Sequence, residues 1–143
     1  MKQCPKQQKM KNKSIIYGIV LVVMAMVVWI GMDTFTQPGI GDLKGTYSEI
    51  STYRNENNTG PVLRIYAVYT ADTLWEDMEA YGNFMPHTKY GNTKVFFFSD
   101  INHTPKEVVP DAPHFDAQYG RYCVGKYEKT AMGEVSLVKF PFK

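Results

Sequence analysis

The stretch that decides the fold is residues 62–86, which read VLRIYAVYTADTLWEDMEAYGNFMP. Residues 62–70 are rich in β-forming side chains and almost continuously apolar, which predicts a strand in the interior of a sheet. Thr73 and Glu76 match the capping box, in which each side chain bonds the other residue's backbone amide, so a helix is predicted over residues 73–81. Gly82 suits the position just after a helix, although the helix could run on to Met85, where Pro86 would stop it.

Two further strands are predicted on either side of this unit. Residues 45–53 alternate in part between apolar and polar side chains, which is typical of a partly exposed strand. The Asn- and Gly-rich residues 55–61 then form a turn. On the other side, residues 94–99 read KVFFFS and predict a short buried strand, and the proline-rich residues 100–114 predict a long loop.

The last part of the chain allows two interpretations. Aromatic residues at helical spacing make a helix over residues 115–129 conceivable, but Gly120 and Gly125 would each cost it about 1 kcal/mol. The alternative is a hairpin with arms 122–127 and 135–140, and it is favoured; Pro141 then confines the end of the second arm to a sheet edge. Residues 45–143 are therefore expected to form one α+β domain. It would have a mostly antiparallel sheet of about five strands and one covering helix.

An N-terminal hydrophobic segment precedes this domain. Residues 14–32 contain 19 residues without a charge, which span about 29 Å as a helix, close to the thickness of the bilayer core. Tyr17 and Trp29 lie towards its two ends, where amphipathic rings prefer the membrane interface. A single transmembrane anchor is predicted, joined to the domain by a short tether, residues 33–44.

A retained anchor is favoured over a cleaved signal peptide, because the run is long and no small-x-small cleavage pattern follows it. Residues 1–13 carry five lysines and no acidic residue. By the positive-inside tendency they predict a cytoplasmic tail and place residues 45–143 outside the cytoplasm.

The charge distribution argues against nucleic acid as a partner. From Asp33 to Lys143 there are 11 basic and 14 acidic residues, a net charge of −3, so the overall +2 comes from the lysine-rich tail. Nucleic-acid-binding domains usually show a basic face instead. The expected partners are the lipid bilayer and another envelope protein, and no cofactor motif is present.

Few residues suggest catalysis. Asp100, His103, His114 and Asp116 flank the proline-rich loop and could together ligate a metal, but solvated histidines beside turn-forming aspartates are the favoured interpretation. Cys123 could serve as a nucleophile if it were exposed near a histidine, whereas a buried, small apolar role is favoured.

Aromatic residues are more numerous in the domain than one small core needs. Rings left at the surface would suit a protein interface, although partial burial at the rim of the core explains them equally well. The candidate interaction residues are Tyr66, Tyr69, Trp75, Tyr81 and Tyr90.

Two hypotheses about function remain. The first is a membrane-anchored, non-catalytic interaction module outside the cytoplasm, acting as an accessory subunit of an envelope protein complex. The alternative is a small envelope hydrolase or metal-dependent enzyme that uses the loop of His103 and His114, or Cys123. Convergence of the two histidines with Asp100 and Asp116 on one point would favour the enzyme.

Overall fold

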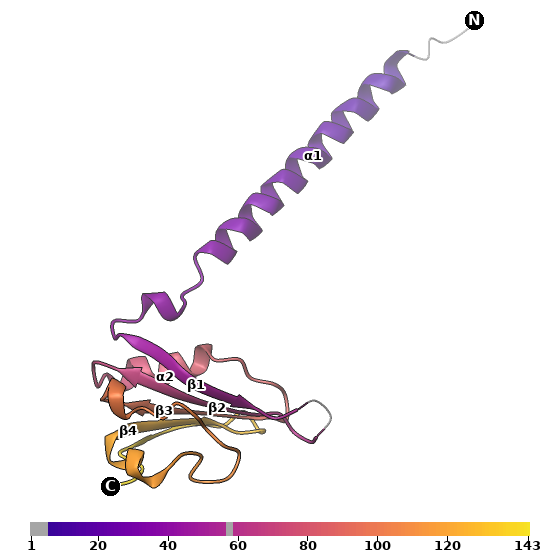
Figure 1. The fold of residues 1–143 in the computed structure, drawn as a ribbon. Helices are drawn as coiled ribbons and strands as arrows, with labels where there is room; N and C mark the ends of the chain where they lie inside the picture. The colour runs from indigo at the N-terminus through magenta and orange to yellow at the C-terminus, as the bar shows by residue number, and fades with distance from the viewer. Residues whose placement is uncertain (1–5, 57–58) are drawn as a thin grey trace, which may run out of the picture. The chain divides into compact units, whose positions relative to one another are not determined.

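A computed structural model describes the backbone of residues 6–56 and 59–143, with side chains from residue 12 onwards. The first five residues of the predicted 1–13 tail lie outside this description. The chain divides between Pro38 and Gly39 into two units, an N-terminal helix and the α+β domain (Figure 1).

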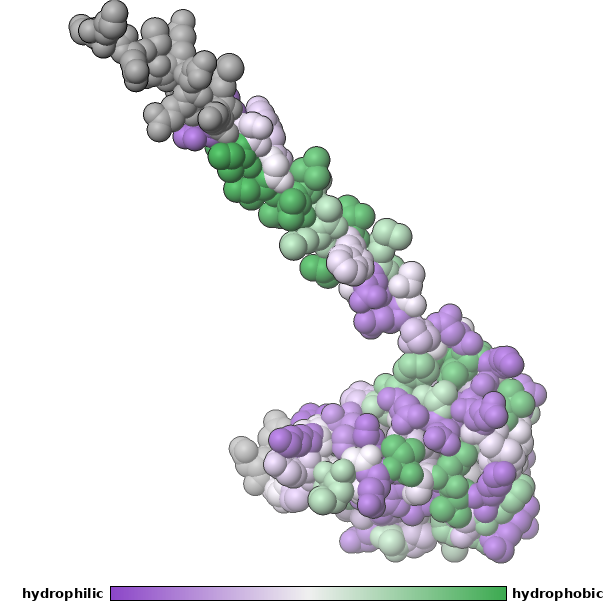
Figure 2. Space-filling view, turned by 180° about the vertical axis from the view of Figure 1, so that it is seen from behind, coloured by the Kyte–Doolittle hydropathy of each residue, from purple (hydrophilic) through white to green (hydrophobic). Residues whose placement is uncertain are grey.

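The N-terminal unit is the helix α1, Lys6–Phe35. Its segment Asn12–Phe35 is long and apolar enough to cross a membrane. Its apolar side chains are exposed all round, and hydrophobic residues cover the middle of the helix (Figure 2). Tyr17 and Trp29 are 72% and 75% exposed. The helix includes residues 33–35 of the predicted tether, and Ile40–Asp42 form a 3₁₀ turn, η1, within the rest.

The domain is built on one five-stranded mixed sheet whose spatial order follows the chain. Its elements are β1 Tyr47–Arg54, β2 Leu63–Thr70, α2 Trp75–Phe84, β3 Asn92–Phe98, β4 Cys123–Lys129 and β5 Val135–Lys139. Three of the four strand pairings are antiparallel, and β2 and β3 are parallel because α2 carries the chain back between them. The α+β class is confirmed, and residues 123–139 form the favoured hairpin after a short 3₁₀ helix, η3 (Ala117–Tyr122).

The predicted capping box at Thr73 is wrong. The helix begins at Trp75 with Leu74 in the N-cap position, so Glu76 is the second helical residue and not the third. Asp77 instead accepts a hydrogen bond from the Gly45 amide at 2.8 Å, which ties the start of α2 to the chain leading into β1. The carboxylates of Glu76 and Asp77 both lie in the first turn, where they interact favourably with the positive end of the helix dipole.

Helix α2 packs closely on one face of the sheet through Gly82, which lies inside the helix and not after it. A Cβ atom at Gly82 would lie 2.3 Å from Cγ of Tyr127, so only glycine permits this approach. The Tyr127 hydroxyl donates to Oδ1 of Asn83 at 2.8 Å, which satisfies the polar end of an otherwise buried ring. This face forms the larger core cluster: Tyr66, Val68, Met78, Tyr81, Met85, Val95, Phe97, Val124 and Tyr127.

The opposite face of the sheet is covered by residues 99–122, which include the segment 100–114 predicted as a long loop. Residues 99–122 contain two 3₁₀ helices, η2 (Ile101–His103) and η3, and they pack Val108 and Phe115 onto the sheet. The cluster beneath them consists of Ile65, Ala67, Phe96, Phe98, Val108, Phe115 and Cys123. The sheet is therefore buried on both faces, which explains the nearly continuous apolar runs in β2 and β3.

Candidate functional site

The two histidines of the predicted metal site serve separate structural roles. Asp100 accepts hydrogen bonds from the Asn102 amide at 2.9 Å and from Nδ1 of His103 at 2.8 Å, and so caps η2. The hydrogen bond from His103 is the main reason that the pKa of Asp100 lies below its usual value. Asp116 caps η3 in the same way, by accepting from the Gln118 amide. The aspartates are the turn formers that the sequence suggested.

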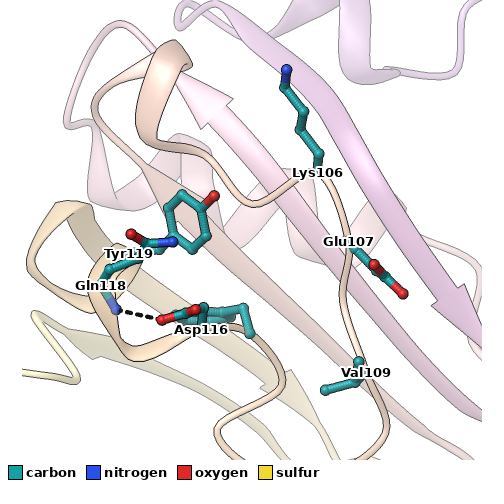
Figure 3. A pocket seen from close by; sticks show the side chains of 7 residues that line it. Lys106, Glu107, Val109, Asp116, Gln118 and Tyr119 are labelled. Carbon is teal, nitrogen blue, oxygen red and sulfur yellow. Dashed lines mark hydrogen bonds between the residues drawn. The ribbon is translucent and has the colours of Figure 1, made fainter.

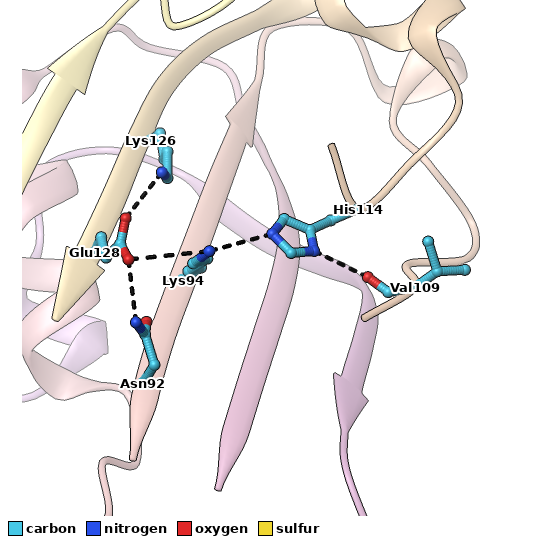
Figure 4. A network of polar contacts seen from close by, with 6 residues as sticks. All are labelled: Asn92, Lys94, Val109, His114, Lys126 and Glu128. Carbon is cyan, nitrogen blue, oxygen red and sulfur yellow. Dashed lines mark hydrogen bonds and ion pairs between the residues drawn. The ribbon is translucent and has the colours of Figure 1, made fainter. Parts of the chain in front are cut away.

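His114, in contrast, is not a solvated loop residue as expected. It is only 5% exposed, with its Nδ1 3.0 Å from the carbonyl oxygen of Val109 and its Nε2 3.3 Å from Nζ of Lys94 (Figure 4). Because a carbonyl can only accept and an ammonium can only donate, the two contacts assign a neutral ring with its proton on Nδ1. Burial, and next the nearby lysines, lower the pKa of His114 and maintain this neutral form.

The network continues from Lys94 across to β4. Oε1 of Glu128 lies 3.9 Å from Nζ of Lys94 and accepts a hydrogen bond from the side-chain amide of Asn92 at 3.1 Å. Its Oε2 accepts a hydrogen bond from Nζ of Lys126 at 2.8 Å. Burial opposes ionisation of Glu128, but these contacts outweigh it and hold its pKa below the usual value. Oδ1 of Asn92 is buried without a hydrogen-bond partner, so one acceptor of the network is left unsatisfied.

The predicted catalytic groups do not converge. Among the residues that the structure describes, no three His, Cys, Asp or Glu side chains are placed to hold a metal. Cys123 is buried and free, and burial raises the pKa of its thiol to about 12. A thiol with this pKa holds almost no nucleophilic thiolate at neutral pH, and the favoured interpretation of Cys123 as a small core residue agrees with its position.

The five candidate interaction residues do not form one surface. Tyr66 and Tyr81 are 8% and 4% exposed and belong to the core beneath α2, so they leave little area for a partner. Tyr69 and Trp75 are half-buried, and Lys139 lies over the Trp75 ring at 5.0 Å. Tyr90 alone of the five is largely exposed, at 65%.

An open cavity of about 420 Å³ lies between residues 106–109 and η3 (Figure 3). Phe115 contributes to its lining together with charged and amide side chains. The carboxylate of Asp116, which faces it, already accepts the hydrogen bond that caps η3. Its polar side chains are exposed, and a surface hollow of this kind does not identify a ligand.

The two edges of the sheet differ in how well they are protected. The β1 edge carries a bulge between Glu49 and Ser51, and the Ser51 hydroxyl donates to the carbonyl of Pro105 at 2.7 Å. Strand β5 pairs without a register shift, only with β4, and exposes Val135 and Val138 by 40% and 47%. Bulges and charges protect an edge from further strands, so β5 is the less protected edge. The only sequence signal for it was Pro141, which placed the end of this strand at an edge.

No protein-family model matches the chain, and neither a curated protein nor a solved structure matches it.

Proposed function

We propose that the chain is a membrane-anchored, non-catalytic interaction module that serves as an accessory subunit of an envelope protein complex. In this proposal α1 crosses the membrane with its lysine-rich end in the cytoplasm, and the α+β domain lies outside. The domain binds a partner protein through the free edge of β5.

The observation that carries the proposal is the exposed edge of β5. An extended segment of a partner can add to such an edge through main-chain hydrogen bonds, while pockets or side chains along the strand provide specificity. Val135 and Val138 offer apolar contacts there, and the bulged β1 edge offers a poorer template.

The use of the titratable groups supports a binding role over the catalytic alternative. His114 and Glu128 are committed to the network that joins β3 and β4 to the covering segment, and the Cys123 thiol is buried. His103 is paired with Asp100 at the surface. None of these groups is presented to a substrate by a described pocket.

The membrane assignment is supported by the length, apolar surface and flanking charges of α1. A helix that is apolar on all sides has no polar face for water, so a bilayer accounts for it. The lysines of residues 1–13 lie before the segment, and the domain after it is mildly acidic. This asymmetry favours a cytoplasmic N-terminus.

Site-specific photo-crosslinking in native membranes tests the use of the β5 edge. A photoreactive phenylalanine analogue at Val138 should form an adduct with a partner protein, whereas the same analogue at Ser48, an exposed position of β1, should not. Adding Val135→Glu to the Val138 probe places a charge on the edge, opposite its paired residue Lys129, and should abolish the adduct. Ser48→Glu serves as the matched charge on the other edge and should leave the Val138 adduct unchanged. Equal adducts from both edges, or none from β5, would contradict the proposal.

A further inference from the structure

Strand β5 directs main-chain groups away from the sheet at every second residue. The Phe140 amide donates to the Val124 carbonyl at 2.9 Å, and in this register the even-numbered residues of β5 exchange hydrogen bonds with β4. In an antiparallel pair the intervening residues point their amides and carbonyls away from the neighbouring strand. The outward-facing residues of β5 are therefore Val135, Leu137 and Lys139.

Both ends of this outward row are closed. Two residues after Lys139, where the next outward amide would lie, Pro141 has no amide hydrogen. Two residues before Val135, the Gly133 amide is used within the turn, where it donates to the Thr130 carbonyl at 2.9 Å. The edge therefore offers an added strand three residues that each have both an amide and a carbonyl.

The outward row is complementary to the same row of a second copy. In an antiparallel pairing about a twofold axis at Leu137, Val135 of each copy lies opposite Lys139 of the other. All outward amides and carbonyls are then paired, in three residue pairs with two hydrogen bonds each. A register shifted by two residues would instead bring Gly133 or Pro141 into the row. Pairing about Leu137 is thus the register that satisfies every outward group.

The charges at the edge also suit this pairing. Like charges directly opposite each other destabilise a strand pair, but the only charged residue of β5, Lys139, lies opposite Val135. The acidic Glu134 of the other copy comes next in sequence to that Val135, so opposite charges approach each other. Lys129 of the other copy is two strands away from Lys139, at about 10 Å, where salt screens the repulsion.

Exposed apolar side chains are concentrated along the same edge. Val135 and Val138 are 40% and 47% exposed, and beyond the two ends of the strand Met132 is 88% exposed and Phe142 is 41% exposed. The twofold pairing brings Met132 of one copy to the end of β5 at which Phe142 of the other copy lies. Thioethers and aromatic rings make favourable contacts. A second copy would therefore cover apolar surface that the isolated domain leaves in water.

We infer that two copies of the chain pair through β5, antiparallel and about Leu137, and so join their five-stranded sheets into one sheet of ten strands. The inference goes beyond the proposed function, because one edge cannot hold a second copy and a different partner protein at the same time. The dimer is the form that the chain takes without its partner, and binding of the partner separates it. The short strand pair makes a small interface, which a partner segment can displace.

Cysteine crosslinking of the full chain in detergent tests the register, in a Cys4→Ser background in which Cys123 is buried. Ser136 of each copy lies opposite Val138 of the other in a non-hydrogen-bonded pair, with Cα atoms about 4.5 Å apart, within reach of a disulfide. Oxidised glutathione should therefore convert Ser136→Cys/Val138→Cys into a species of twice the chain mass.

The matched controls are the single variants Ser136→Cys and Val138→Cys. Each should stay uncrosslinked, because in this register identical positions of the two copies are about 8 Å apart, too far for a disulfide. A register shifted by two residues would instead place Ser136, or Val138, opposite itself. Crosslinking of a single variant, or none in the double variant, would overturn the inference.

Removal of one outward amide tests the main-chain contribution to the dimer. Val135→Pro removes an amide that does not pair with β4, so urea unfolding should still show a folded domain. Its dimer dissociation constant should rise about thirtyfold, about fivefold for each of the two hydrogen bonds lost, as measured by sedimentation in density-matched detergent. Val135→Ala keeps the amide and should weaken the dimer much less. A monomeric wild type, or equal dissociation constants for Val135→Pro and the wild type, would overturn the inference.

The photo-crosslinking experiment separates the dimer from the proposed function. A purified chain that is monomeric, with a Val138 adduct to a different protein in membranes, would refute the dimer and leave the proposed function standing. A Val138 adduct of twice the chain mass and no other would support the dimer and contradict the proposed function. Val135→Glu places a carboxylate opposite Lys139 of the second copy, so it should abolish the adduct with the partner but not the adduct between copies.

Discussion

The buried imidazole of His114 joins the covering segment 99–122 to the sheet. It donates to the Val109 carbonyl and accepts from Lys94, while its own φ of +78° turns the chain sharply at this point. The ring can make both contacts only while it is neutral. A titratable residue that first suggests metal binding or catalysis is thus used here as a structural link.

This link predicts loss of stability in mild acid. The folded pKa of His114 lies below its usual value of 6.5, so the unfolded state binds the proton more tightly. The stabilisation is fully present above the unfolded pKa and is lost as the pH falls from about 6.5 through the folded pKa. Urea unfolding of the full chain in detergent should therefore give a smaller free energy of unfolding at pH 5 than at pH 7.5. His114→Gln should be less stable at pH 7.5 but less sensitive to pH.

His87 has a lowered pKa as well and contributes in the same direction. His87→Gln is therefore the matched control, because it removes the titration of His87 and leaves the His114 network intact. The role given to His114 would be contradicted if the free energy of unfolding kept its pH dependence in His114→Gln and lost it in His87→Gln.

At the scale of the elements, the sheet is held between two unlike layers. Helix α2 covers one face, and its contact depends on Gly82 against Tyr127. The irregular segment 99–122 covers the other face with Val108 and Phe115. The helix approaches the sheet closely at one glycine, so this position is sensitive to the smallest added volume.

Gly82→Ala is predicted to destabilise the domain although alanine is the better helix former. Helix propensity alone favours alanine by about 1 kcal/mol. The added methyl would lie within the Tyr127 ring and force α2 or the ring to move, which costs about 1–3 kcal/mol or more. Chemical denaturation should therefore show a net loss. Glu79→Ala, at an exposed position of α2, should change stability by less than about 0.5 kcal/mol; a stabilised Gly82→Ala would refute the close contact.

At the scale of the whole molecule, charge and hydrophobicity are strongly segregated along the chain. Five lysines precede the apolar helix, and a domain with net charge −3 follows it. The positive-inside tendency associates this order with a cytoplasmic N-terminus, which is the orientation proposed above.

The predicted topology is testable by protease accessibility. In the proposed orientation, protease added to intact spheroplasts should remove the α+β domain and leave α1 in the membrane. An epitope placed at the N-terminus should remain protected, which serves as the control for membrane integrity. A full-length chain that resists the protease until detergent is added would reverse the orientation, and release by alkaline carbonate would contradict the anchor.

Much of the local structure could be read from the sequence because it depends on neighbouring residues. The nearly continuous apolar run of β2, the amphipathic helix that follows it and the final hairpin all have patterns that a short window contains. The predicted capping box is wrong because the helix begins at Trp75, one residue later than the motif implies. The covering role of residues 99–122 was not predicted, because the prolines and the lack of periodicity in this segment are typical of a loop. Its conformation depends on its contacts with the sheet, which are distant in sequence.

The sequence by itself determined the apolar N-terminal helix, the class of the domain and the strands and helix that compose it. Only the tertiary structure decided which tyrosines are buried and which edge of the sheet is unprotected. It also decided that Lys94, His114 and Glu128 form one network. Strand register pairs Lys94 of β3 with Glu128 of β4, and the covering segment adds His114. Register depends on pairing between distant segments, which composition and local periodicity do not encode.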